Sequence, residues 1–355
     1  MKEKVLMKGN EAIAEAAILA GCRHYFGYPI TPQTEIPEYL ARRMPQVGGV
    51  FLQAESELAS INMVYGAAGA GARAMTSSSS PGISLMQETI STLAAAELPC
   101  VIVNISRGGP GLGSIQGAQS DYFQSTKGGG HGDYRLLVLA PNSVQEMADL
   151  TVLAFDRADH YRTPVLLLGD GVIGQMMEPV ILPEPVTEIL PKPWASSGLK
   201  GRTETNVINS LYLNAEQCER HNLDLQAKYK EMAQNEVRWE ERETDDAEWL
   251  LVAYGISSRI ALTVMQKARE EGIKVGIFRP ITLWPFPYDA LANASKRIKG
   301  ILIIEQNAGQ MIEDVRLAVG ENLPIDFHGR MGGMLPESQD IVEQLKGFVQ
   351  QRGGE

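Results

Sequence analysis

The chain has 355 residues, of which 44% are apolar and 21% are charged, and its formal net charge is −11. This balance is that of an ordinary globular protein with enough apolar material for a buried core, and the length predicts two domains. The acidic charge, without a basic tail or a Lys/Arg cluster, makes nucleic acid and anionic membranes poor partners.

The N-terminal sequence does not resemble a targeting segment. Met1-Lys2-Glu3-Lys4 is charged, and no apolar stretch of signal-peptide type follows it. The longest apolar run, near 165–168, is short enough for a buried strand and too short to span a membrane. We therefore expect a cytoplasmic protein that does not enter a membrane.

The first half of the chain alternates between helix and strand patterns. Asn10 is expected to cap a helix that Gly21 ends. Strands are predicted at 24–28, 50–53, 73–78, 100–105, 136–140 and 165–168, and further helices at 55–72, 83–96 and 144–158. This alternation predicts a mostly parallel sheet with helices on both faces.

The pattern changes at about residue 180. A proline-rich stretch to Pro193 predicts an extended linker, and the polar segment 204–243 is expected to form a solvated helix or an arm packed on a partner. A second α/β unit begins at Trp249, with strands at 250–254, 275–278, 301–304 and 325–328 and helices at 258–270, 288–298, 310–319 and 339–349. The predicted division is therefore a first domain at 1–190, an arm at 191–245 and a second domain at 246–355.

The segment Tyr28-Pro29-Ile30-Thr31-Pro32 lies where a strand ends and a helix is predicted to begin. Ligands bind at this place in open α/β sheets, and a helix N-terminus offers free N–H groups to an anion. Thr31 and Pro32 also fit an ordinary N-cap and first-turn proline. On local chemistry alone, that simpler interpretation is preferred.

Glu55 and Glu57 stand before a helix of small residues at 66–72. Small residues let a flat ligand approach the backbone, so a carboxylate here could be buried against an aromatic heterocycle. Acidic residues also favour the first turn of any helix because of its dipole. Taken alone, Glu55 and Glu57 are interpreted as ordinary acidic residues at the start of a helix.

Two polar loops are further candidates. Thr76 to Gly82 could bind an anion through its hydroxyl and amide groups or could be a simple serine-rich turn. The glycine-rich loop 107–133 is long enough to suggest a function. Within it, Arg107 and Lys127 could meet anions and His131 could hold a proton.

No metal site is expected in this chain. Its three cysteines, Cys22, Cys100 and Cys218, are far apart and form no C-x-x-C pair, so each is expected to be a small buried residue. The stretch 169–171, Gly-Asp-Gly, resembles the start of the magnesium-binding signature of thiamine enzymes. The asparagine pair that this signature needs is absent from 191–200, so we interpret 169–171 as a strand-end turn.

Together, the motifs at 28–32, 57, 76–82, 107–110 and 127–133 resemble the alpha subunit of 2-oxoacid:ferredoxin oxidoreductases. The sequence at 278–287, Phe-Arg-Pro-Ile-Thr-Leu-Trp-Pro-Phe-Pro, resembles the second domain of that family. The resemblance covers nearly the whole chain, and only residues at about 195–245 have no counterpart in it. The resemblance implies an α/β protein with two parallel-sheet domains, a thiamine-diphosphate pyrimidine-binding fold followed by a transketolase C-terminal-like domain.

The resemblance also implies which subunit binds each cofactor. Thiamine diphosphate would be shared with a beta subunit that binds the diphosphate. Mg²⁺ and the [4Fe-4S] clusters would lie in partner subunits, including ferredoxin-like and gamma subunits, and not in this chain. Coenzyme A would be the co-substrate and ferredoxin the electron acceptor, and the chain would be active only with its partners.

The resemblance assigns roles to particular residues. Glu57, with Glu55 as second choice, would lie against the ring nitrogen of the cofactor's aminopyrimidine, and Thr31 would hydrogen-bond the carboxylate or keto oxygen of the substrate. The remaining implied contacts are Tyr28, Pro29, Ser79 and Gly82 with the cofactor and Arg107 and Lys127 with the substrate.

The preferred substrate is predicted from the stretch 113–119. Family members acting on 2-oxoglutarate carry an arginine there, suited to a second carboxylate, whereas this stretch has none. This stretch and the run 122–127 look closer to branched-chain members, which oxidise 3-methyl-2-oxobutanoate. Because an apolar pocket separates acids that differ by a methylene only modestly, a range of branched 2-oxoacids is expected, and pyruvate stays open as a substrate. Three alternatives stay open: a 2-oxoglutarate enzyme that uses Arg107 or Lys127, a non-catalytic scaffold subunit, and a self-sufficient transketolase-like enzyme.

Overall fold

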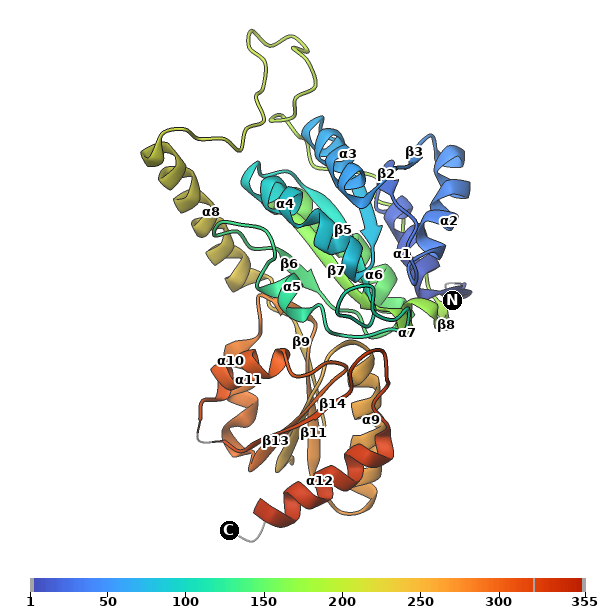
Figure 1. Cartoon of the computed structure of the whole chain (residues 1–355), viewed down its shortest axis with the longest axis vertical. Coiled ribbons are helices and arrows are strands. Elements are labelled where there is room, and N and C mark those ends of the chain that lie inside the picture. The colour runs from blue at the N-terminus through green and yellow to red at the C-terminus, as the bar shows by residue number, and fades with distance from the viewer. Residues whose placement is uncertain (1–2, 322, 353–355) are drawn as a thin grey trace.

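The computed structural model describes residues 3–321 and 323–352. The remaining residues, 1–2, 322 and 353–355, include the outer ends of the two predicted domains and lie outside the described part. The described chain forms two sheet-based units, one at each end of the molecule's long axis (Figure 1). None of the helices described combines the length and apolar character needed to cross a bilayer.

The N-terminal unit contains a seven-stranded sheet with the order β12-β6-β7-β5-β4-β2-β3. Its strands are β2 (His24–Gly27), β3 (Val50–Gln53), β4 (Ala74–Ser78), β5 (Cys100–Ser106), β6 (Leu137–Leu139), β7 (Pro164–Asp170) and β12 (Thr282–Trp284). Neighbours pair in parallel except β12, a strand from the second half of the chain that runs antiparallel to β6. Strands β5 and β7 are buried along their whole length, as their continuous apolar sequences predict.

Helices cover both faces of this sheet. They are α1 (Gly9–Leu19), α2 (Glu35–Arg43), α3 (Glu57–Gly69), α4 (Ser80–Ala95), α5 (Tyr122–Thr126), α6 (Val144–Tyr161) and α7 (Gly171–Gln175), with a 3-10 turn at Met44–Val47. Alternate residues of β5 point to opposite sides, so Val101 packs with α1, α2 and α6 while Ile102 packs with α3 and α4. An antiparallel ribbon of β1 (Val5–Lys8) and β8 (Met177–Val180) lies beside α1.

The C-terminal unit contains a five-stranded sheet with the order β14-β13-β10-β11-β9. Its elements are β9 (Trp239–Arg242), β10 (Trp249–Val252), β11 (Val275–Pro280), β13 (Gly300–Glu305), β14 (Ile325–Gly329), α9 (Gly255–Glu270), α10 (Tyr288–Ala294), α11 (Met311–Val319) and α12 (Ser338–Arg352), with a 3-10 turn at Ser295–Arg297. Strand β9 is the antiparallel edge strand, although its polar sequence suggested part of the arm.

The arm between the two units contains one long helix, α8 (Ala215–Asn235). Leu225, Tyr229 and Met232 bury one side of α8 against the core of the N-terminal unit, and Lys228 forms an ion pair of 2.9 Å with Glu97. The chain before α8 extends away from the body of the molecule as a loop (Figure 1). The helix is therefore packed on this same chain, and its opposite side is exposed.

Two predicted helix starts are wrong. Helix α1 begins at Gly9, so Asn10 lies inside it, and its side-chain amide donates to the Pro32 carbonyl oxygen at 2.8 Å. Helix α2 begins at Glu35, and residues 30–33 form a turn closed by the Gln33 N–H and the Ile30 carbonyl. Buried hydrogen bonds from distant residues hold this turn, and they outweigh the local preference for an N-cap at Thr31.

Cys22 and Cys100 are buried, as predicted, whereas Cys218 on α8 is partly exposed. Burial in apolar surroundings raises the thiol pKa of both Cys22 and Cys100 to about 12. These two thiols are therefore inert packing groups at neutral pH.

Candidate functional site

Glu57 is the first residue of α3, and its side chain is almost entirely buried. The Ser56 hydroxyl accepts the Ala59 N–H at 3.2 Å and so fixes the start of the helix at Glu57. Glu57 is only 6% exposed, and within the described residues its carboxylate has no hydrogen bond or ion pair. Because a buried carboxylate without a donor is costly, this group indicates a site that a molecule from outside the chain completes.

The space around this carboxylate depends on a glycine. A Cβ atom built on Gly82 would lie 2.6 Å from Glu57 Oε1 and would overlap the Ser78 hydroxyl. The start of α4 therefore approaches Glu57 so closely that no side chain fits between them. The structure brings Glu57, Gly82 and Ser79 together at the carboxyl end of β4.

A row of buried hydroxyl groups surrounds this place. The hydroxyl oxygens of Thr76, Ser78 and Ser79 have no hydrogen-bond partner within the described residues. All three lie on or directly after β4. Such groups are rare in folded proteins, and they mark a position where water or a ligand supplies the missing bonds.

Arg107 joins two loops beside this site. Its guanidinium donates to the Thr31 carbonyl at 2.9 Å and to the Leu112 carbonyl at 3.0 Å, and its backbone N–H donates to the Ser80 hydroxyl. Arg107 is 8% exposed and has no ion pair in the part of the chain that the structure describes. Asp121 is near enough for its charge to interact with that of Arg107, but no carboxylate contacts the guanidinium directly, so it can still bind an anion.

The other predicted residues fall into two groups. Tyr28, Pro29 and Thr31 are exposed at the carboxyl end of β2, on the turn that Arg107 holds. Lys127 lies elsewhere: its ammonium contacts both carboxylate oxygens of Asp314 in α11, at 2.7 and 2.9 Å. Lys127 therefore ties the two units together, and its charge is already neutralised.

Gln119 is a residue that the sequence did not single out. Its side-chain amide donates to the Tyr254 carbonyl at 2.7 Å, and its amide oxygen accepts from the Ser257 hydroxyl and the Gln306 N–H. Its backbone carbonyl accepts from Tyr254 and Asn307, and its N–H donates to Gln306. All its polar atoms are thus bound to the C-terminal unit, and nothing in a glycine- and serine-rich loop signals such a contact.

Replacing Gln119 by leucine is expected to lower the free energy of unfolding by about 2–4 kcal/mol, because several buried groups lose their partners at once. Gln116→Leu, on the same loop but at an exposed position without a side-chain hydrogen bond, is the matched control and is expected to change it by less than about 0.5 kcal/mol. Urea denaturation of both variants measures the difference. Equal stabilities would show that Gln119 does not hold the two units together.

The stretch 169–171 is the junction at which β7 ends and α7 begins, with no separate turn between them. Strand β7 ends at Asp170, whose carboxylate caps α7 through the N–H groups of Val172 and Ile173 and also accepts the Ile256 N–H of the C-terminal unit. Burial raises the pKa of Asp170 to about 6. No group of three or more His, Cys, Asp or Glu side chains in the described ranges is arranged to hold a metal ion.

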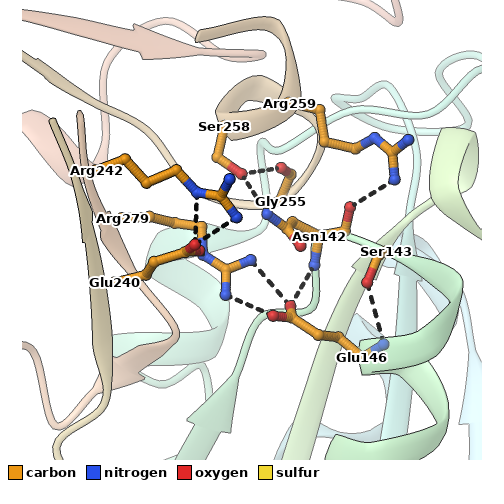
Figure 2. Close-up of polar contacts among 9 residues, drawn as sticks. All are labelled: Asn142, Ser143, Glu146, Glu240, Arg242, Gly255, Ser258, Arg259 and Arg279. Atoms are coloured by element: carbon orange, nitrogen blue, oxygen red, sulfur yellow. Dashed lines mark hydrogen bonds and ion pairs between the residues drawn. The ribbon is translucent and has the colours of Figure 1, made fainter. Parts of the chain in front are cut away.

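A cleft of about 750 Å³ lies between the units on the side of β9 (Figure 2). Arg279 makes two hydrogen bonds to Glu146, at 2.9 and 2.7 Å, and Arg242 pairs with Glu240 at 2.6 Å. Arg259 reaches Glu178 at 2.8 Å. Because a carboxylate faces each arginine, we interpret this cleft as an ion-paired contact between the units rather than an anion site.

Comparison with known proteins shows the family of this chain. The family described as "Pyruvate flavodoxin/ferredoxin oxidoreductase, thiamine diP-bdg" matches residues 15–243, and "Pyruvate:ferredoxin oxidoreductase core domain II" matches residues 247–341. Ketoisovalerate oxidoreductase subunit VorB of Methanothermobacter thermautotrophicus is 52% identical over 342 residues, which cover 96% of this chain and 97% of that protein. The chain belongs to the 2-oxoacid:ferredoxin oxidoreductase family.

More distant members complete the comparison. The 2-oxoglutarate synthase subunit KorA of Archaeoglobus fulgidus is 39% identical over 97% of this chain and 99% of that protein. A solved 2-oxoglutarate:ferredoxin oxidoreductase of Magnetococcus marinus superposes with a TM-score of 0.89 and 28% identity, covering 98% of this chain and 66% of that one. A split-gene transketolase superposes with a TM-score of 0.60 at 13% identity, which shows a shared fold alone.

These matches confirm the predicted family and the predicted α/β fold class with parallel sheets. The family catalyses coenzyme-A-acylating oxidative decarboxylation of 2-oxoacids as a multi-subunit enzyme, and the matching N-terminal family is thiamine-diphosphate-binding.

Proposed function

We propose that this chain is the subunit of a 3-methyl-2-oxobutanoate:ferredoxin oxidoreductase that holds the pyrimidine of thiamine diphosphate and the 2-oxoacid. In this reaction the 2-oxoacid and coenzyme A give acyl-coenzyme A, carbon dioxide and a proton, while two electrons pass singly to ferredoxin. The observation that carries the proposal is the Glu57 carboxylate, which is almost buried, packed closely against Gly82 and without a partner within the described residues. When bound, thiamine diphosphate supplies the electron sink for decarboxylation.

Glu57 is assigned the proton chemistry at the cofactor. Its carboxylate would share a proton with the ring nitrogen of the aminopyrimidine, which gives the buried group the donor that it lacks within the described residues. Gly82 lets the start of α4 lie directly against the carboxylate and so fixes its position, and the Ser79 hydroxyl is free to bond the ring. Tyr28 and Pro29 would cover the ring from the end of β2.

Arg107 and Thr31 are assigned the substrate. The guanidinium would attract the 2-oxoacid carboxylate, and the exposed Thr31 hydroxyl would bond its carboxylate or keto oxygen. Neither cation source that the sequence offered for a second carboxylate is available: the stretch 113–119 has no arginine or lysine, and Asp314 neutralises Lys127. This favours the branched acid over 2-oxoglutarate, as does the higher identity to the ketoisovalerate relative than to the KorA relative.

Partner subunits are assigned the remaining parts. A beta subunit would bind the diphosphate and Mg²⁺, and ferredoxin-like and gamma subunits would complete the path for electrons from the [4Fe-4S] clusters to ferredoxin. Large apolar side chains beside the site are exposed in the single chain, which supports a partner covering them: Leu58, Leu85, Leu112 and Ile115. The proposed compartment is the cytoplasm.

The test is co-purification of this chain with its natural partners, followed by reduction of methyl viologen with coenzyme A and either 2-oxoacid. Clear preference for 3-methyl-2-oxobutanoate, with no activity from this chain alone, is the expected result. Preference for 2-oxoglutarate would keep the family but make 2-oxoglutarate the assigned substrate. No reduction by any 2-oxoacid, with clusters and cofactor intact, would favour a scaffold subunit. Activity of the isolated chain with Mg²⁺ would favour a self-sufficient enzyme.

Arg107→Met is expected to raise the KM for the 2-oxoacid by about 10–10²-fold, because a charged hydrogen bond contributes about 1.5–3 kcal/mol. Lys127→Met is the matched control: it removes a cation from the same long loop but is expected to leave this KM unchanged. Steady-state kinetics of the assembled enzyme measure both values. If Lys127→Met raised the KM and Arg107→Met did not, the two assignments would have to be exchanged.

A further inference from the structure

The loop 107–117 leaves the N-terminal unit at the end of β5 and returns to its own starting point. Arg107 and Gly117 form an isolated antiparallel bridge, which closes the base of the loop. The tip is free, because the side chains of Leu112 and Ile115 are exposed. Arg107, the residue assigned to the 2-oxoacid, therefore stands at the fixed base of an otherwise exposed loop.

A carboxylate that the proposed function does not use is buried beside this base. Asp121 is 8% exposed, and its Oδ2 atom accepts the Ser80 hydroxyl at 2.6 Å and the Asn104 side-chain amide at 2.8 Å. Burial raises the pKa of Asp121 more than these donors and the charge of Arg107 lower it. A buried carboxylate is costly to keep, so its place beside the substrate loop calls for a reason.

The Ser80 hydroxyl connects Asp121 to Arg107. Its oxygen accepts the Arg107 backbone N–H at 2.9 Å. Its single proton can go to Asp121 Oδ2 at 2.6 Å or to the Arg107 carbonyl at 3.3 Å, and the shorter contact, to a carboxylate, is the stronger one. The hydrogen bonds therefore run in one direction, from the Arg107 N–H through the Ser80 hydroxyl to the Asp121 carboxylate.

Asn104 fixes the direction in which the Ser80 hydroxyl points. The Asn104 amide oxygen accepts the Ser80 N–H at 3.1 Å, while its amide nitrogen donates to Asp121, so the three residues form a closed ring of hydrogen bonds. Ser80 has a φ of 20°, a value that residues other than glycine seldom adopt, and this ring holds it there. The hydroxyl is thus directed at the base of the substrate loop.

We propose that Asp121 is a positioning residue for the 2-oxoacid: through the Ser80 hydroxyl it fixes the backbone of Arg107 and so directs the guanidinium toward the acid. The guanidinium donates to the Thr31 and Leu112 carbonyls, and a shift of its backbone carries its remaining N–H groups away from the acid. Asp121 acts as a hydrogen-bond acceptor in this role, not through its charge. The inference rests on the proposed function, which assigns the acid to Arg107.

Two pairs of variants test this role in the assembled enzyme. Asp121→Leu removes the acceptor, whereas Asp121→Asn removes the charge and keeps an oxygen in its place. Ser80→Ala breaks the connection to Arg107, whereas Ser84→Ala removes an exposed hydroxyl on the next turn of α4 that contacts Gln124 instead.

Three quantities are measured on each variant. The first is the pair of KM and kcat for 3-methyl-2-oxobutanoate. The second is the Ki of its methyl ester, which resembles the acid but has no charge for Arg107 to bind. The third is amide hydrogen exchange of the peptide 105–113, which does not depend on turnover.

Ser80→Ala and Asp121→Leu are expected to raise the KM for the acid by about tenfold and to speed exchange in the peptide, with kcat and the Ki of the ester within about threefold. Asp121→Asn and Ser84→Ala are expected to stay within about threefold of the unchanged enzyme in every quantity. If Asp121→Leu does not assemble, Ser80→Ala and Asp121→Asn decide the question.

Three results would overturn the inference. An unchanged KM in Ser80→Ala would show that Arg107 keeps its place without the hydroxyl. An equal rise in the KM for the acid and in the Ki of the ester would show a general loosening of the site. A tenfold rise in the KM of Asp121→Asn would show that the charge of Asp121 acts on the acid, not its hydrogen bond.

Hydrogen exchange separates this inference from the proposed function. If the assembled enzyme oxidises no 2-oxoacid, the proposed function fails, and faster exchange of the peptide in Ser80→Ala but not in Ser84→Ala still supports the part of the inference that concerns Arg107. If the enzyme is active and Ser80→Ala alters neither the KM nor the exchange, the inference fails while the function stands.

Discussion

Glu57→Gln is expected to lower kcat for 2-oxoacid oxidation by about 10²–10⁴-fold, the usual contribution of a positioned acid–base group. The amide has nearly the same shape and fits the same buried place, but it cannot share a proton with the ring nitrogen of the cofactor. Since the carboxylate has no partner within the described residues, its loss breaks no internal hydrogen bond. We therefore expect the folded chain and its assembly with partners to be retained.

Glu55→Gln is the matched control for this prediction. Glu55 lies two residues before Glu57 but is exposed, so its replacement is expected to leave kcat within about twofold. Viologen reduction by the two assembled variants, with thermal unfolding as a check on the fold, gives the comparison. Turnover near that of the unchanged enzyme in Glu57→Gln would refute the role of Glu57, and loss of turnover in Glu55→Gln alone would transfer the role to Glu55.

Gly82→Ala is expected to lower activity by at least about 10²-fold while changing the free energy of unfolding by no more than about 1 kcal/mol. The added Cβ atom would lie 2.6 Å from Glu57 Oε1, too close for the carboxylate to keep its place. The three nearest atoms, Ser78 Oγ, Glu57 Oε1 and Glu57 Cγ, all belong to side chains, which can change rotamer. Alanine is also favoured over glycine in a helix by about 0.8–1 kcal/mol. The fold can therefore adapt, but the adaptation displaces the group on which the chemistry depends.

Gly66→Ala separates this effect from a general effect of glycine replacement. Gly66 lies in α3, the helix that Glu57 begins, and a Cβ atom there would have no neighbour within 4 Å. Its replacement is expected to leave activity unchanged and to stabilise the fold by about 0.5–1 kcal/mol. Urea denaturation and steady-state rates measured on both variants test the contrast. Full activity of Gly82→Ala would show that the close approach to Glu57 is not required.

Much of the fold follows from local sequence patterns. The continuous apolar runs of β5 and β7 predict buried parallel strands, and the structure confirms them. The small residues of α3 and the glycine at position 82 indicate close approach, although the sequence alone left an ordinary helix start as the simpler interpretation of Glu57. The structure adds the deciding facts, which are the burial of the carboxylate and its lack of a partner.

The structure departs from the local sequence patterns where residues far apart in the sequence are in contact. Thr31 fits an N-cap, but Asn10 and Gln33 make buried hydrogen bonds that hold residues 30–33 in a turn. Lys127 fits an anion site by residue type, but Asp314 of the C-terminal unit neutralises it. No local pattern near either residue reports these partners.

The sequence by itself determined the class of the protein: parallel α/β units, the family, and the short motifs that face the proposed site. These depend on periodicity and on residues near one another in the chain, where backbone sterics and apolar burial act locally. Only the tertiary structure decided which charges are free, how Gln119 joins the units, and which groups contact Arg107. Charge neutralisation and hydrogen-bond satisfaction depend on the distance between atoms in the folded chain, which the order of residues does not give.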